Sequence, residues 1–210
     1  MNNVNDLIAT RLLEIEAVKV QPDSPFTWAS GWLSPFYCDN RKTLSYPDLR
    51  GLIRDSLCKL IEDEFPSFDT VAGVATGAIA QGALVADKLQ KPFIYVRSAP
   101  KDHGMANLIE GNLLPDSKVI VVEDLVSTGG SSLKAVEALR HAGCEVVGMV
   151  ASFTYGFTVA QEAFDKAGVK LRTLTDYSSM LAAARRSGYI REESMDTLNE
   201  WRKNPSEWGK

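Results

Sequence analysis

Hydrophobic residues in the middle of the chain form short uninterrupted runs separated by longer amphipathic stretches. The runs cover residues 71–75, 93–96, 119–122 and 146–153. Runs without alternation are typical of strands buried on both faces, so we expect a parallel sheet. Residues 79–89 and 130–142 have apolar positions at helical spacing and would supply connecting helices. This alternation predicts right-handed crossovers and an α/β fold with helices on both faces of the sheet.

The two ends of the chain follow a different pattern. We expect an amphipathic helix near residues 7–15, whereas residues 21–43, rich in Pro, Gly and aromatic side chains, suit short strands or irregular structure. Pro47 and an apolar stripe predict a helix from about residue 45 to Pro66. The remaining pattern predicts a helix at 159–167, a strand at 169–175, and helices at 179–187 and 192–202.

Composition and charge restrict the class of protein. The chain has 210 residues, of which 45% are hydrophobic and 24% charged, as expected for one globular domain. Its net charge of −4 disfavours a nucleic-acid binder. No stretch approaches the roughly 20 apolar residues of a membrane helix, and no export signal is evident. Cys38, Cys58 and Cys144 are widely spaced, which favours reduced thiols in a cytoplasmic protein.

The most informative segment is residues 119–132, VIVVEDLVSTGGSS. Four apolar residues lead to Glu123 and Asp124, and a Ser/Thr/Gly loop then enters a helix. Such a loop can bind phosphate, because its glycines let backbone N–H groups converge and the helix N-terminus is partially positive. Two carboxylates would repel that phosphate unless they face ribose hydroxyls or a bound Mg²⁺. The segment predicts a ligand with a phosphate at one end and a diol and metal near its middle.

A simpler interpretation is that the two acids cap a turn and the glycines only connect a strand to a helix. Turn chemistry requires one or two of these residues rather than the whole run, so we favour a ligand site. Two other nucleotide-binding motifs are missing, since the chain has no Gly-Lys-Ser/Thr and no Gly-x-Gly-x-x-Gly.

Three segments resemble one known family. Residues 123–131, EDLVSTGGS, resemble the signature that binds phosphoribosyl pyrophosphate (PRPP) in type I phosphoribosyltransferases. Residues 95–104, YVRSAPKDHG, are similar to the mobile catalytic loop of orotate-using members, and residues 26–37, FTWASGWLSPFY, to their base-binding hood. The resemblance implies a single domain, residues 1–210. Its core would cover about 44–168, and its hood about 1–43 plus part of the C-terminal region.

The resemblance also implies a reaction. PRPP, bound with Mg²⁺, would lose pyrophosphate from C1 of its ribose as orotate attacks, giving orotidine 5′-monophosphate for pyrimidine synthesis. Glu123 and Asp124 would hold the ribose hydroxyls, and Lys101 and His103 would complete the catalytic set, because cations at the leaving group favour the transition state. Mg²⁺ would be held mainly through PRPP, without a direct protein ligand. The other expected PRPP-binding residues are Arg97, Leu125, Val126, Ser127, Thr128, Gly129, Gly130, Ser131, Thr76 and Gly77.

For the base, the resemblance implies contacts from Ser127, Phe36, Tyr37 and Tyr155. Many relatives carry basic residues at or near four positions that are neutral here: Ala29, Gly77, Ser98 and Tyr155. A charge-assisted contact contributes about 1.5–3 kcal/mol, so the base is less well determined than the PRPP chemistry. The family further implies a homodimer in which the loop at 99–112 reaches into the neighbouring subunit's site.

Two other functions remain open at this point. The same chemistry could act on another base, such as a purine. Alternatively, the fold could serve a regulator that senses PRPP without catalysis. Such a regulator should carry a DNA-binding module or a basic RNA face, and an acidic chain of 210 residues has room for neither.

Overall fold

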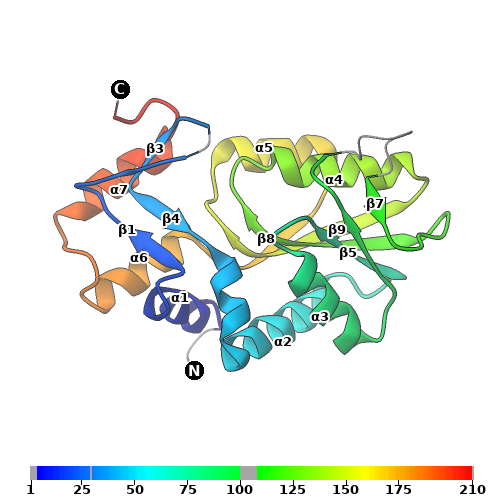
Figure 1. Cartoon of the computed structure of the whole chain (residues 1–210). Coiled ribbons are helices and arrows are strands. Elements are labelled where there is room, and N and C mark those ends of the chain that lie inside the picture. Colours follow the sequence, from blue (N-terminus) through cyan, green and yellow to red (C-terminus); the bar gives the residue numbers. More distant parts are fainter. Residues whose placement is uncertain (1–3, 29, 100–107, 210) are drawn as a thin grey trace.

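The computed structural model describes residues 4–28, 30–99 and 108–209. Its main feature is a six-stranded sheet with the order β10-β9-β8-β5-β6-β7 (Figure 1). Every neighbouring pair is parallel except β6 and β7, which are antiparallel. The strands are β5 (Thr70–Val74), β6 (Phe93–Val96), β7 (Ile109–Glu110), β8 (Lys118–Val126), β9 (Glu145–Thr154) and β10 (Leu171–Asp176).

Helices cover both faces of this sheet, as the apolar runs predicted. On one face lie α1 (Val4–Glu14), α2 (Pro47–Glu64) and α3 (Ile79–Leu89); on the other lie α4 (Gly130–His141) and α5 (Thr158–Ala167) (Figure 1). Alternate residues of one strand enter the two separate cores. In β8, Ile120 and Val122 pack toward α2 and α3, whereas Val119 and Val121 pack toward α4 and α5. The predicted α/β fold is confirmed.

The segments predicted as the hood form a smaller lobe beside the sheet (Figure 1). Two antiparallel pairs build its β-structure, β1 (Val18–Val20) with β4 (Phe36–Cys38) and β2 (Phe26–Thr27) with β3 (Leu33–Ser34). The 3-10 helix η1 (Asn40–Ser45) links β4 to α2, and α6 (Tyr177–Arg186) and α7 (Ser194–Lys203) complete the lobe. The main sheet continues to Asp176, beyond the expected core limit near residue 168.

An aromatic cluster joins this lobe to the sheet. Tyr155, directly after β9, is 3% exposed and lies at its centre. Its ring centroid is 5.1–6.4 Å from those of six other rings: Trp28, Phe36, Phe153, Phe157, Tyr177 and Trp201. Burial of such rings is a large favourable term, and tilted or offset pairs add about 0.5–1.5 kcal/mol each. The lobe is therefore held to the sheet by packing of residues from both ends of the chain.

Strand β8 differs from its predicted length in a way that affects the site. The apolar run ends at Val122, but the strand continues to Val126 because β9 pairs with it as far as Thr154. Pairing with β5 stops earlier, at Gly73 opposite Val122. Residues 123–126 therefore extend beyond β5 and have a strand neighbour on one side only. We call residues 123–126 the overhang of β8.

Candidate active site

The overhang of β8 carries the predicted acid pair, Glu123 and Asp124, at the carboxyl end of the parallel sheet. Ligands of open α/β sheets bind beyond this end. The sequence predicted a strand over 119–122 with both acids directly after it and before the loop; the strand is longer, and both acids belong to β8. Strand pairing with β9 therefore fixes their backbone.

Glu123 is a buried acid with two hydrogen bonds. It is 5% exposed; its Oε1 accepts from the Asp124 backbone N–H at 2.9 Å and its Oε2 from the Ser132 hydroxyl at 2.9 Å. Removal from water, followed by the negative charge of Asp124, raises the pKa of Glu123 to about 8. In the unliganded protein, burial beside a second acid therefore favours the protonated form of Glu123.

Asp124 lies between the hood and the loop that follows β5. Its carboxylate packs on Gly77 so closely that a Cβ built on Gly77 would lie 2.0 Å from Asp124 Oδ2. Burial raises the pKa of Asp124, and the nearby Arg41 opposes that shift. Arg41 in turn donates from Nε and Nη2 to the Asp39 carboxylate, at 2.7 and 3.0 Å. A side chain at residue 77 would displace the acid.

The phosphate loop is shorter than the sequence indicated. Leu125 and Val126 belong to β8, and Val126 is fully buried, with its carbonyl accepting from the Tyr155 N–H at 3.1 Å. Residues 127–129 form the turn itself, and α4 begins at Gly130. Gly129 has a φ of +83°, and a Cβ there would lie 2.9 Å from the Phe164 ring. The turn places hydroxyls and free N–H groups at the start of α4, which suits an anion.

A groove of about 890 Å³ borders this turn. Gly130 and Ser131 line one side, while Ala75, Arg97 and Ser98 line the side formed by the ends of β5 and β6. Its other lining residues are Val74, Val96, Leu108, Ile109, Lys134, Ala135, Glu137, Ala138, His141 and Ala142. Arg97 has its Nη1 3.6 Å from Glu110 Oε1. The groove thus brings Arg97, predicted to bind pyrophosphate, to the same space as Gly130 and Ser131 at the start of α4, which are predicted to bind phosphate.

The remaining residues of the sequence prediction do not line this groove or lie outside the described residues. Lys101 and His103 lie outside the described residues, as does Ala29 of the hood. Thr76 and Gly77 form the turn between β5 and α3, and the Ala75–Thr76 peptide bond is cis. Thr128 is half-buried in the turn before α4.

A smaller cavity of about 280 Å³ lies on the hood side of the overhang. Among the described residues that line it, none carries a formal charge; they are Thr27, Trp28, Tyr37, Cys38, Leu125, Ser127 and Tyr155. Burial raises the pKa of the Cys38 thiol and of the Tyr155 hydroxyl, so both stay neutral. Three of the four residues predicted to contact the base meet here. The fourth, Phe36, is fully buried and instead packs its ring against Phe153, Tyr155 and Tyr177.

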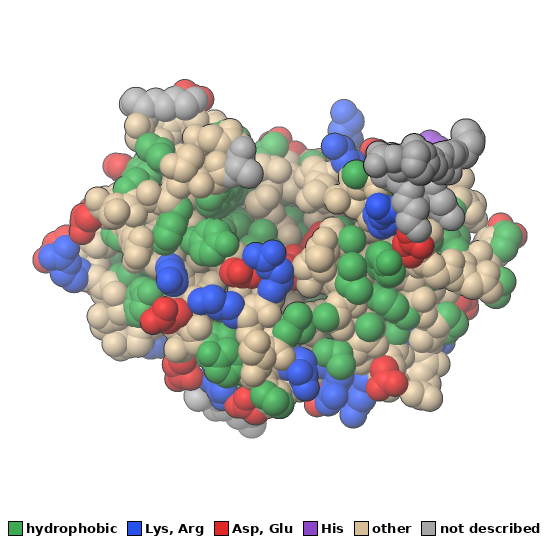
Figure 2. All heavy atoms as spheres, in the orientation of Figure 1, with side chains coloured by type: hydrophobic (Ala, Val, Ile, Leu, Met, Phe, Trp, Pro, Cys, Tyr) green, Lys and Arg blue, Asp and Glu red, His purple; other side chains and the backbone are tan. Residues whose placement is uncertain are grey.

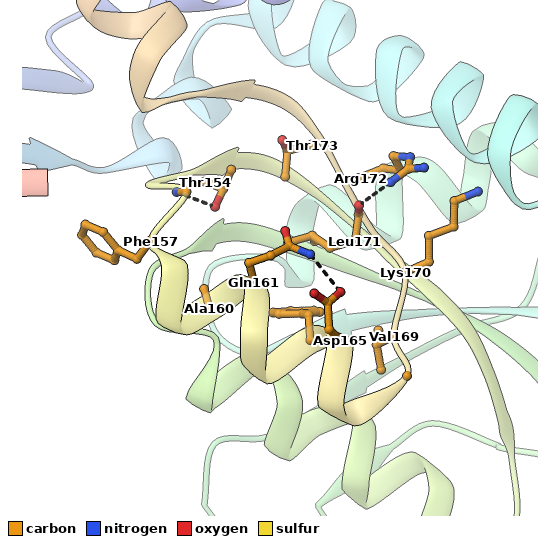
Figure 3. Close-up of a pocket in the computed structure, with 13 residues that line it drawn as sticks. Thr154, Phe157, Ala160, Gln161, Asp165, Val169, Lys170, Leu171, Arg172 and Thr173 are labelled. Atoms are coloured by element: carbon orange, nitrogen blue, oxygen red, sulfur yellow. Dashed lines mark hydrogen bonds between the residues drawn. The ribbon is translucent and has the colours of Figure 1, made fainter. Parts of the chain in front are cut away.

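The surface also shows two hydrophobic regions, one on the smaller lobe and one over the sheet. On the face shown in Figure 2, charged side chains of both signs lie between the hydrophobic side chains of the smaller lobe and those over the sheet. A separate groove of about 590 Å³ runs between α5 and the edge strand β10 (Figure 3). In that groove Gln161 donates to Asp165 and Arg172 donates to its neighbour's carbonyl. None of its lining residues belongs to the acid pair or the phosphate turn, so we assign the site to the overhang.

Sequence reasoning missed the partners of the acid pair. Asn40 donates from Nδ2 to the Asp124 backbone carbonyl at 2.7 Å, and Ser132 binds Glu123 from the first turn of α4. The resemblance to the hood was traced only as far as Tyr37, three residues short of Asn40. The polar run Asp39-Asn40-Arg41 directly after β4 was the available signal.

Comparison with known proteins identifies the class. The family model for the phosphoribosyl transferase domain matches residues 45–176, so the chain belongs to this family. The orotate phosphoribosyltransferase of Bacteroides thetaiotaomicron is 64% identical over 208 residues, covering 99% of this chain and 98% of that protein. That of Porphyromonas gingivalis is 60% identical over 209 residues, covering all of both chains.

Solved structures give the same result. The orotate phosphoribosyltransferase from Aeropyrum pernix has a TM-score of 0.76 and 29% identity, covering 88% of this chain and 99% of that one. The Mycobacterium tuberculosis enzyme in complex with PRPP has a TM-score of 0.66 and 26% identity, covering 84% and 98%. Within the described ranges, no helix is both long and apolar enough to cross a membrane.

Proposed function

We propose that this chain is an orotate phosphoribosyltransferase, which transfers the phosphoribosyl group of PRPP to orotate and releases pyrophosphate. The observation that carries the proposal is the pair of buried acids on the overhang of β8, which leads through a short turn into α4, where Gly130 and Ser131 line the same groove as Arg97. PRPP has a 5′-phosphate for the start of α4, a ribose diol for the acid pair and a pyrophosphate for the side of the groove that holds Arg97. Relatives that cover the full chain at 60–64% identity bear this name.

The acid pair acts on the ribose. Asp124 accepts from a ribose hydroxyl, and its charge stabilises the positive charge that develops on the ring as the bond to pyrophosphate breaks. Glu123, in its protonated form, can donate to a ribose oxygen, while Ser132 and the Asp124 N–H hold its carboxyl in place. A pair with one proton also repels the phosphates of PRPP less than two ionised acids would.

The two ends of PRPP bind to the turns around the overhang. The 5′-phosphate accepts from N–H groups and hydroxyls of residues 127–131 at the start of α4. The pyrophosphate faces Arg97 and the turn of Thr76 and Gly77, with Lys101 and His103 supplied by the loop that follows Ser98. These cations stabilise the leaving group as its charge grows.

The residues present also fit Mg²⁺ bound together with PRPP. In the described part of the chain no group of three or more acidic, His or Cys side chains could form a metal site alone. Mg²⁺ usually keeps several waters and binds together with substrate phosphates, so PRPP would supply most of its ligands and a direct protein ligand is not required. When bound, the ion neutralises charge on the pyrophosphate.

The neutral cavity takes the base. Orotate is a flat pyrimidine, and Trp28, Tyr37 and Tyr155 offer ring surfaces, while the Ser127 hydroxyl and Thr27 offer hydrogen bonds. Ser127 lies in both the phosphate turn and the cavity lining, so it marks where ribose and base join.

The assembly and location follow the family expectation. We propose a homodimer in which the loop between β6 and β7 serves the neighbouring subunit's site; the predicted range of 99–112 was too long, since Ile109 and Glu110 form β7 of this chain's own sheet. We also propose a place in the cytoplasm, which the three free thiols favour.

The deciding experiment follows the loss of orotate with PRPP and Mg²⁺, beside adenine, hypoxanthine, xanthine and uracil and a chelated control. Consumption of orotate alone, only with metal, is the expected result. Turnover of a purine instead would keep the PRPP assignments and overturn the base. PRPP binding without turnover of any base would favour the regulator.

A further inference from the structure

The overhang of β8 lacks a strand neighbour where β5 ends, and one hood residue occupies that place. Pairing with β5 stops at Val122, so nothing from that strand reaches the Asp124 carbonyl. Asn40 does, donating from Nδ2 at 2.7 Å across 84 residues of sequence. A buried carbonyl left unbonded would cost about 1–3 kcal/mol and would leave the segment free to shift.

The amide of Asn40 is itself held in one orientation. It is 6% exposed, and its Oδ1 accepts from the Cys38 thiol at 3.3 Å. Its backbone carbonyl accepts from the Thr43 hydroxyl at 2.6 Å, which fixes the start of η1. The side chain therefore connects Cys38, which lines the neutral cavity, to Asp124, whose carboxylate packs on Gly77.

We propose that Asn40 is a positioning residue for the reaction. Its side-chain amide holds Asp124 at a fixed position relative to the base cavity, where pairing with β5 has already ended. This inference rests on the proposed function. Asn40 touches neither substrate; it acts through Asp124, which must meet the ribose while the base is held on the Cys38 side. Misplacement of a reacting group by about 1 Å can cost on the order of 10²-fold in rate.

The hood offers a matched control. Ser34 is fully buried, and its hydroxyl donates to the Phe36 carbonyl at 2.6 Å and accepts from the Phe36 N–H at 3.2 Å. Ser34→Ala therefore removes a buried side chain to backbone hydrogen bond from the same lobe without touching the overhang.

The first test compares kcat, both KM values and thermal stability for Asn40→Ala and Ser34→Ala. We expect Asn40→Ala to lower kcat by about 10–100-fold with both KM values within about threefold. We expect Ser34→Ala to keep kcat within about twofold at a similar loss of stability. Equal kcat values for the two variants would overturn the proposal.

If Asn40→Ala fails to fold, a second variant tests the positioning role of Asn40. Asn40→Asp keeps the shape but faces the Asp124 carbonyl with a second acceptor until it is protonated. The ratio of variant to wild-type kcat should therefore rise as the pH falls from 8 to 5. Glu123, Asp124, Asp39, Arg41 and the Cys38 thiol lie nearby in both proteins, so the variant is compared with the wild type at each pH. A flat ratio would contradict the proposal.

Failure of this inference is distinguishable from failure of the proposed function. A wild-type protein that does not convert orotate overturns the function, whereas an active wild type with unaffected Asn40 variants overturns only the positioning role. Hydrogen exchange of the unliganded protein needs no activity: Asn40→Ala should speed exchange at residues 123–126 by about tenfold or more, and Ser34→Ala should not. Equal exchange in both variants would also overturn the positioning role.

Discussion

The overhang with its phosphate turn and the hood cavity lie side by side but are built in opposite ways. The overhang and turn come from one continuous stretch, residues 123–131, and contain two buried acids. The cavity comes from four separate stretches, and its described lining is neutral. Under the proposed function, the residues that act on the ribose therefore come from one local motif, whereas the residues that recognise the base are brought together by tertiary packing.

The largest expected effect tests the overhang. Gly77→Ala should lower kcat by about 10³-fold, because the added methyl would occupy the space of the Asp124 carboxylate. Steady-state kinetics with orotate and PRPP measures this. Gly51→Ala in α2 is the control, since its nearest neighbour is Arg54 Nη2 at 4.0 Å. Normal turnover of Gly77→Ala would show that the position of Asp124 is not critical.

A slightly smaller effect concerns the pyrophosphate side. Lys101→Ala should lower kcat by about 10²–10³-fold while PRPP still binds, because one charge contact to the leaving group is removed. Turnover and PRPP binding are measured on the same preparation. The control is Lys59→Ala, which removes an exposed ion pair to Asp63 on α2. An unchanged kcat would remove Lys101 from the mechanism.

A third prediction tests the neutral cavity. Tyr155→Phe should raise the KM for orotate by about tenfold and leave the KM for PRPP unchanged, because it removes a hydroxyl from the cavity wall. Tyr177→Phe is a matched control, since that buried hydroxyl donates to the Leu198 carbonyl away from the cavity. Equal values of KM for the two variants would mean that Tyr155 only packs.

The smallest effect is on stability. Glu123 has a folded pKa of about 8, above the ordinary value of 4.5, so the folded state binds its proton more tightly and stability falls as the pH rises between these values. From pH 6 to 9 the wild type should lose on the order of 2 kcal/mol, or roughly 4–8 °C in Tm, relative to Glu123→Gln. Thermal melts of the unliganded proteins measure this, with Glu162→Gln as an exposed control. Parallel curves would refute the raised pKa.

Local patterns predicted the main sheet because each apolar run is buried on both faces regardless of what lies elsewhere. The same reasoning ended β8 at Val122, since polar residues follow, and it could not include the pairing with β9 that continues the strand to Val126. The short strands β1 and β7 were missed because two or three residues show no clear periodicity.

The site was predictable within the same limit: local patterns identified some of its residues, and those that depend on distant contacts were missed. Glu123 and Asp124 could be found because acids rarely follow a buried strand without a reason. Asn40 could not, since its role depends on a contact 84 residues away. Phe36 and Tyr37 are adjacent aromatic residues, yet Phe36 is fully buried and Tyr37 lines the cavity. Only the packing of the aromatic cluster separates them.

The positions of the tryptophans determine which part of the molecule intrinsic fluorescence can monitor. Of the four tryptophans, Trp28 and Trp32 lie between β2 and β3, and Trp201 and Trp208 lie near the C-terminus; none lies in the central sheet. Intrinsic fluorescence therefore records the lobe that would receive the base, while far-ultraviolet circular dichroism is dominated by the sheet and its helices. Unfolding curves recorded both ways reveal whether that lobe loosens before the rest of the chain does.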